Sequence, residues 1–208
     1  VDGVLFIVME LITGGNLRAY VKRLYEEARV LGFPEIVELT RQVAEGLGYA
    51  HSRGMIHRDI KPDNIVLRPL NVAGALLPYQ PLITDFGLAR LMEASAEDAI
   101  TDQPVGTYPY MSPEQCLGLD SDGRTDVYGL GVLLYELAVG KLPFQPRNIG
   151  EAARMHGQEP VPLPSIVRPN FPAPLEAVIL KALAKRPEDR YQNGNEMAAA
   201  LRELQARG

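Results

Sequence analysis

The sequence predicts a mainly α-helical protein, α+β overall, with a few short β-strands near its start. Apolar residues recur every three or four positions after Pro34, and again over residues 173–185 and 193–206, as is typical of amphipathic helices. A further helix, expected over residues 125–139, is apolar nearly all round, which indicates a central position in the core. Helices therefore supply most of the expected fold.

Caps, breakers and short apolar runs predict the remaining elements. Asn16 is a favourable N-cap for a short helix that reaches about Leu24, and Gly140 is a natural C-cap for the central helix. Prolines and a glycine within residues 68–81 indicate a loop. The other expected elements are a strand over residues 4–10, a helix from Pro34 that stops at Gly54, short strands over residues 65–67 and 82–84, and a short helix near residues 149–156.

Composition narrows the class of protein. The chain has 208 residues, 46% of them hydrophobic, and a formal charge of -5, which suits one globular domain and argues against nucleic acid or an anionic membrane as the main partner. One cysteine, Cys116, excludes an internal disulfide framework and a cysteine-based zinc site. Neither a signal peptide nor a membrane-spanning apolar run is found. We therefore expect a cytoplasmic domain.

The chemistry is concentrated in His57-Arg58-Asp59-Ile60-Lys61-Pro62-Asp63-Asn64, with Asp85-Phe86-Gly87 following 21 positions later. Phosphoryl transfer needs a group that orients the nucleophile, oxygen ligands for a metal, and positive charge near the phosphate. Magnesium favours one or two carboxylates together with phosphate oxygens and water. Asp59, Lys61, Asn64 and Asp85 supply these groups, and they would face one cleft if the intervening strands pair.

The two motifs resemble the catalytic loop and metal motif of the eukaryotic-type, or Hanks-type, Ser/Thr protein kinases. The resemblance implies that Asp59 accepts or orients the substrate hydroxyl and that Lys61 contacts the transferred phosphate. It also implies that Asn64 and Asp85 hold Mg²⁺, with Mn²⁺ as an alternative, beside the phosphates of ATP. Lys61-Pro62 after the catalytic Asp is the Ser/Thr-type sequence, so protein Ser/Thr hydroxyls are the expected substrates.

The resemblance extends over nearly the whole chain and implies a partial kinase domain. Residues 1–12 would be the last N-lobe strand and the hinge, residues 13–208 the C-lobe, and residues 85–114 the activation segment. ATP-pocket roles follow for Met9 as gatekeeper, the backbone of Glu10 and Ile12 at the adenine edge, Asn16 at the ribose, and Val66 as the adenine floor.

Other matched positions have supporting roles in the family. Gly106–Glu114 would seat the substrate peptide, with Thr107 hydrogen-bonding near Asp59 and Lys61. We expect a buried ion pair between Glu114 and Arg190. Asp126 would brace the catalytic loop, while His57 and Phe86 are packing residues. Arg58 could pair with a phosphate on the activation loop, for which Thr101 is the preferred site and Ser95 the second choice.

The Gly-rich loop, the strand lysine and its glutamate partner precede the hinge in this family, and none is found in the sequence. We therefore expect the chain alone to be inactive and to require an N-lobe. Two alternatives stay open: a pseudokinase or binding scaffold, and a small-molecule phosphotransferase of similar fold. The intact catalytic motif and the Pro113-Glu114 segment favour the protein kinase. The region around Tyr110 and the compact stretch after Gly140 resemble bacterial receptor-like Ser/Thr kinases.

Overall fold

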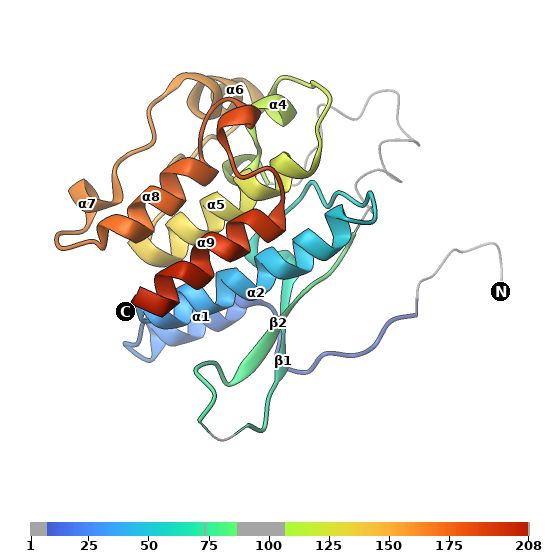
Figure 1. Cartoon of the computed structure of the whole chain (residues 1–208), viewed down its shortest axis with the longest axis vertical. Helices are drawn as coiled ribbons and strands as arrows, with labels where there is room; N and C mark the ends of the chain where they lie inside the picture. The colour runs from blue at the N-terminus through green and yellow to red at the C-terminus, as the bar shows by residue number, and fades with distance from the viewer. Residues whose placement is uncertain (1–7, 73, 87–106, 208) are drawn as a thin grey trace.

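A computed structural model of the chain describes residues 8–72, 74–86 and 107–207, and helices dominate it (Figure 1). The longer helices are α1 (Leu17–Glu26), α2 (Phe33–His51), α5 (Gly123–Val139), α6 (Ile149–Gln158), α8 (Ala173–Ala182) and α9 (Gly194–Arg207). Short helical turns are η1 (Pro62–Asn64), η2 (Tyr108–Tyr110), α4 (Pro113–Cys116), α7 (Pro164–Val167) and η3 (Pro187–Asp189). Strands β1 (Ile65–Pro69) and β2 (Tyr79–Ile83) form an antiparallel hairpin. The predicted mainly α class is confirmed.

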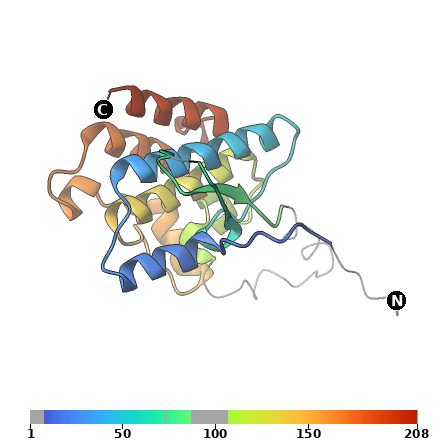
Figure 2. The same ribbon diagram turned by 90° about the horizontal axis from the view of Figure 1, so that it is seen from below.

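Helix α5 forms the centre of the core. Its side chains are buried on every side, including Tyr128, Leu130 and Leu134. This burial explains why the helix is apolar nearly all round in the sequence. Figure 2 shows α9 along one edge of the molecule and α1 along the opposite edge, with α2 and α5 between them. Helix α5 ends at Gly140, whose left-handed φ of 84° suits glycine. The predicted C-cap is therefore confirmed.

Helices α2 and α9 meet at two glycines, and this contact joins the C-terminal helix to the core. A Cβ atom added to Gly48 would lie 2.1 Å from the side-chain oxygen of Asn195, and one added to Gly194 would lie 2.3 Å from the Ala44 carbonyl oxygen. Real Cβ atoms do not approach other atoms so closely. The crossing of the two helices therefore requires glycine at both positions.

The predicted loop over residues 68–81 was wrong at both ends, because the strands extend to Pro69 and start again at Tyr79. Prolines usually break strands because they lack a backbone donor. Here Pro81 lies opposite Leu67, whose amide donates to the Gly15 carbonyl at 2.9 Å rather than to β2. Leu67 and Pro81 therefore share no backbone hydrogen bond that the missing Pro81 amide could remove. Only the stretch between the two strands is a loop.

Two other expected elements differ from the structure. Residues 8–10 form no strand, and the Val8 side chain is 85% exposed; among the described residues no strand pairs with this run, and residues 1–7 lie outside them. The helix expected over residues 173–185 ends at Ala182. Beyond this end, the carbonyls of Ala184 and Lys185 accept from Arg190, at 2.8 and 2.9 Å, instead of from a further helical turn.

Candidate active site

Four of the predicted site residues lie in mutual contact at the catalytic loop. The Lys61 ammonium lies 2.8 Å from Asp59 Oδ2 and donates to Thr107 Oγ1 at 3.0 Å. The Asn64 amide donates to Asp59 Oδ2 at 2.9 Å and to the Asp59 carbonyl at 2.8 Å. The other carboxylate oxygen, Asp59 Oδ1, is buried and accepts no hydrogen bond within the part of the chain that the structure describes. One Asp59 oxygen is thus fixed in place, and the other is buried without a partner among the described residues.

The hairpin brings Asp85 next to this group. Its second strand ends beside η1, where the Thr84 amide donates to the Asn64 carbonyl at 3.0 Å. The ring nitrogen His57 Nε2 meets the Thr84 carbonyl at 2.6 Å, and the His57 ring packs edge-on against Phe86 with 4.8 Å between centroids. Asp85 itself has a left-handed φ of 63°, a conformation that costs free energy in a residue other than glycine. Contacts on both sides of Asp85 hold it there.

The oxygen groups of Asn64 and Asp85 fit a magnesium ion. Because the Asn64 side-chain nitrogen donates to Asp59, its side-chain oxygen Oδ1 is directed elsewhere, and Oδ1 accepts no hydrogen bond from any described residue. The Asp85 carboxylate is exposed, and among the described residues it has only a long 3.5 Å contact with the Thr84 hydroxyl. Magnesium typically takes one or two protein oxygens and completes its shell with phosphate and water. No cluster of three His, Cys, Asp or Glu side chains occurs among the described residues.

Asp126 anchors the backbone of the catalytic loop to α5. This carboxylate is buried and accepts the amides of His57 at 2.8 Å and Arg58 at 2.6 Å. It also lies 2.9 Å from His51 Nε2 at the end of α2. The bracing contact that the sequence predicted is present. The part of His51 was missed, because 75 residues separate it from Asp126 and no local pattern links them.

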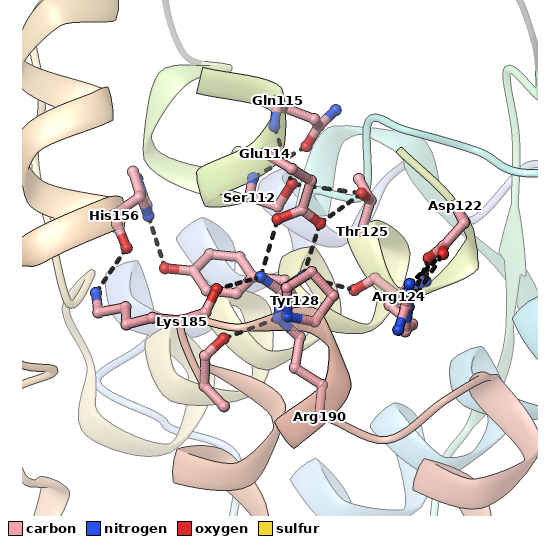
Figure 3. A network of polar contacts seen from close by, with 12 residues as sticks. Ser112, Glu114, Gln115, Asp122, Arg124, Thr125, Tyr128, His156, Lys185 and Arg190 are labelled. Carbon is pink, nitrogen blue, oxygen red and sulfur yellow. Dashed lines mark hydrogen bonds and ion pairs between the residues drawn. The ribbon is translucent and has the colours of Figure 1, made fainter. Parts of the chain in front are cut away.

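The predicted ion pair of Glu114 with Arg190 is also present and buried (Figure 3). Two guanidinium nitrogens of Arg190 reach the two Glu114 carboxylate oxygens, at 2.7 and 2.9 Å. The same carboxylate accepts from the Thr125 hydroxyl at 2.8 Å. Burial alone would raise the pKa of Glu114, but the hydrogen bonds and charge of Arg190 outweigh it and hold that pKa below its ordinary range. The pair fastens α4 to the segment after α8.

A second buried contact joins α6 to α5 and to the turn η2, and Figure 3 shows its part between His156 and Tyr128. The ring nitrogen His156 Nε2 meets the Tyr108 carbonyl at 3.1 Å, and Nδ1 meets the Tyr128 hydroxyl at 2.9 Å. Since a carbonyl only accepts, Nε2 carries the proton and Nδ1 accepts from Tyr128. Burial, together with the charge of Lys185, lowers the pKa of His156 to about 4, so the ring is neutral. The segment expected to seat a peptide is thus tied to the helical core.

Sequence reasoning also missed Arg18. Its guanidinium lies on α1 and reaches Asp63 of the catalytic loop at 3.1 Å, Glu136 of α5 at 3.1 Å and the Tyr110 hydroxyl at 2.9 Å. These partners lie 45 to 118 residues away, so no local sequence pattern signals the contact. Arg18 therefore connects three segments around the catalytic loop.

The residues predicted for the ATP pocket are only partly placed. Met9 is largely exposed, Ile12 is half-buried, and Glu10 pairs with Arg68 at 2.8 Å. Asn16 uses its side-chain oxygen to cap α1 at the Ala19 amide, as predicted. Its backbone bridges to half-buried Val66 in β1. The predicted phosphosites Thr101 and Ser95 lie outside the described residues.

Comparison with known proteins assigns the family. A family model described as the protein kinase domain matches residues 2–201. The chain belongs to this family. It is 42% identical over 186 residues to the serine/threonine-protein kinase Pkn1 of Myxococcus xanthus, a match that covers 89% of this chain and 25% of that protein. It is 38% identical over 197 residues to PknB of Mycobacterium leprae, covering 94% and 30%. The predicted resemblance to bacterial Hanks-type Ser/Thr kinases is confirmed.

This member of the protein kinase family therefore spans about a quarter to a third of the length of the curated relatives it matches. A third relative, the serine/threonine-protein kinase PknH of Mycobacterium tuberculosis, is 34% identical over 205 residues, or 98% of this chain and 30% of that protein. Within the described ranges, no helix combines the length and the apolar character that a membrane crossing requires.

Proposed function

We propose that the protein is a Ser/Thr protein kinase that transfers the γ-phosphoryl group of ATP to hydroxyls of protein substrates. The observation that carries the proposal is the arrangement at Asp59. Lys61 and Asn64 hold one carboxylate oxygen, while the other is buried without a donor among the described residues. A buried acceptor is normally satisfied, so a substrate hydroxyl is a natural partner for it.

The residues divide the work of the transfer. Asp59 Oδ1 accepts the hydrogen bond of the substrate hydroxyl and turns its oxygen lone pair toward the phosphorus atom. The Lys61 ammonium, between Asp59 and Thr107, supplies positive charge where the phosphate gains negative charge. Thr107 and the turn that follows it position the peptide. Asn64 and Asp85 would hold Mg²⁺ or Mn²⁺, which neutralises phosphate charge when bound.

The nucleotide site requires more than this chain, and we propose that an N-lobe preceding it completes that site. Residues 1–12 would then serve as last strand and hinge, residues 13–208 as C-lobe, and Met9, Glu10, Ile12, Asn16 and Val66 as the lower rim of the adenine pocket. The exposed side chains of Val8 and Met9 support this assignment, since apolar residues so placed are expected to meet a neighbour. We also propose a cytoplasmic location for the domain, and a membrane anchor outside this chain stays open as an alternative.

Regulation by phosphate is part of the same proposal. Arg58 precedes the catalytic aspartate, and its Nε atom is buried with no hydrogen-bond partner among the described residues. A phosphate on Thr101 would supply acceptor oxygens for this guanidinium. Such a contact would order the activation segment over residues 85–114.

The test uses the complete protein with radiolabelled ATP, magnesium and a generic Ser/Thr substrate, and mass spectrometry locates the phosphate, including any on Thr101. Asp59→Asn should lower the rate by roughly 10²- to 10⁴-fold, the usual contribution of such a group. Asp120→Asn, at an exposed site between α4 and α5, is the control and should leave the rate unchanged. An inactive wild-type protein that still binds nucleotide would instead favour the scaffold function.

A further inference from the structure

We infer that Gln115 is a positioning residue for Asp59, an inference that deepens the proposed phosphoryl transfer and rests on it. Gln115 lies on α4, outside the catalytic loop, and was not singled out by any motif. Its side-chain amide donates to the carbonyl of Arg58 at 2.7 Å, across 57 residues of sequence. That carbonyl belongs to the peptide unit that leads directly into Asp59.

The Arg58–Asp59 peptide needs such a contact because Arg58 is strained. Its φ of 69° is left-handed, a conformation that costs free energy in a residue other than glycine and persists only where surrounding contacts impose it. The Arg58 amide is held by Asp126, and the Asp59 amide donates to His57 Nδ1 at 3.2 Å. The carbonyl between them is held by Gln115. If Arg58 relaxed, this carbonyl would rotate away and the Asp59 carboxylate would move with it.

Helix α4 gives Gln115 a rigid base. The side-chain oxygen of Gln115 accepts the Ser112 amide at 3.0 Å, while the Ser112 hydroxyl accepts the Gln115 amide at 3.4 Å, so the two residues form a capping box. The neighbouring Glu114 is locked to Arg190. The two ends of the Gln115 side chain therefore have separate functions: the oxygen caps α4, and the nitrogen holds the catalytic loop.

This division makes the inference testable with one substitution. Gln115→Glu keeps an oxygen for the cap, and glutamate is common at this capping-box position, but it replaces the donor to Arg58 with an acceptor. In the complete protein we expect kcat to fall about three- to tenfold, as for the loss of one hydrogen bond. The KM values for ATP and peptide should stay within about twofold, and the melting temperature should fall by no more than about 2–4 °C, the shift expected for the loss of one hydrogen bond.

The matched control is Gln192→Glu. Gln192 also donates its side-chain amide to backbone carbonyls, those of Arg190 at 2.8 Å and Glu188 at 3.2 Å, but it is exposed and makes no contact with the catalytic loop. This control should leave kcat unchanged. An equal fall of kcat in both variants would overturn the inference.

A second measurement on the 208-residue chain does not depend on activity. Hydrogen exchange of the Asp59 amide, followed by NMR, should become several-fold faster in Gln115→Glu and stay unchanged in Gln192→Glu. An inactive wild-type protein with faster exchange in Gln115→Glu would refute the proposed function but keep the positioning role. Gln115 does not position Asp59 if Gln115→Glu leaves the exchange of the Asp59 amide unchanged. The same conclusion follows if the substitution leaves kcat of an active protein unchanged.

Discussion

Replacing Arg190 by methionine should cost more stability than any exposed substitution in this chain. The Arg190 side chain is fully buried and donates to both Glu114 oxygens and to the carbonyls of Ala184, Lys185 and Arg124. Methionine fills similar space but leaves the Glu114 carboxylate buried without its cation. Breaking a buried pair in this way costs about 3–5 kcal/mol, a large part of the about 5–15 kcal/mol that stabilises a typical domain.

The loss should depend on pH in a defined direction. In the wild type the pKa of Glu114 is depressed, so its contribution is present above the unfolded pKa and is lost as pH falls through the folded value. In Arg190→Met the buried carboxylate loses its partner, and its pKa should rise above the unfolded value. Lowering the pH then reduces the stability of the wild type, whereas in the variant it neutralises the buried, unpaired carboxylate. The gap between the two should therefore narrow from pH 7 toward pH 4.

Urea unfolding of the chain, followed by circular dichroism at several pH values, measures this gap. Glu114→Gln combined with Arg190→Met should recover part of the loss, because no uncompensated charge remains. Arg186→Met is the matched control: it breaks an exposed arginine–glutamate pair, that of Arg186 with Glu188, and should leave the unfolding midpoint unchanged. The reasoning would be refuted if Arg190→Met unfolded at the wild-type urea midpoint. It would also be refuted if the difference in stability between the two proteins increased in acid.

Two further predictions concern packing and pH. Gly194→Ala should destabilise the chain by about 1–3 kcal/mol, because its Cβ would overlap the Ala44 carbonyl. Gly157→Ala on α6 has open space and should be neutral or slightly stabilising in the same thermal melts. The pKa of His156 is about 4 when folded and near 6.5 when unfolded, so stability should fall by about 1 kcal/mol per pH unit as pH drops from about 6.5 to about 4. His156→Gln should flatten this dependence of the urea midpoint; equal slopes would contradict the buried neutral ring.

Local chemistry explains which parts of the fold the sequence could predict. Asn16 and Gly140 act through their own backbone and side-chain geometry, and both occupy the predicted ends of helices. The extent of the hairpin depends instead on a distant partner. Gly15 accepts the Leu67 amide, so Pro81 removes no ladder bond from β2. Gly15 lies far from Pro81 in the chain, so the sequence around β2 does not reveal this contact.

The same distinction applies to the site. Asp59, Lys61 and Asn64 lie within six residues of one another, so their type and spacing could predict a common chemistry, and the structure brings them together. The residues that orient this group come from elsewhere in the chain. Arg18 and Gln115 act across gaps of 45 and 57 residues. Their types are ordinary in helices, and only folding gives them a role.

Besides the hydrogen bonds within it, the catalytic loop is held by rigid elements outside it. Asp126 on α5 holds its amides, Gln115 on α4 holds the Arg58 carbonyl, and the Thr84 amide at the end of β2 holds the Asn64 carbonyl. Helix α5 lies at the centre of the core, and α4 is fastened by the Glu114–Arg190 pair. A carboxylate that must meet a hydroxyl within hydrogen-bond distance benefits from such support, because small displacements of reacting groups cost large factors in rate. Substitutions that weaken these distant contacts should therefore lower activity, and the loss should increase with the mobility that Asp59 gains.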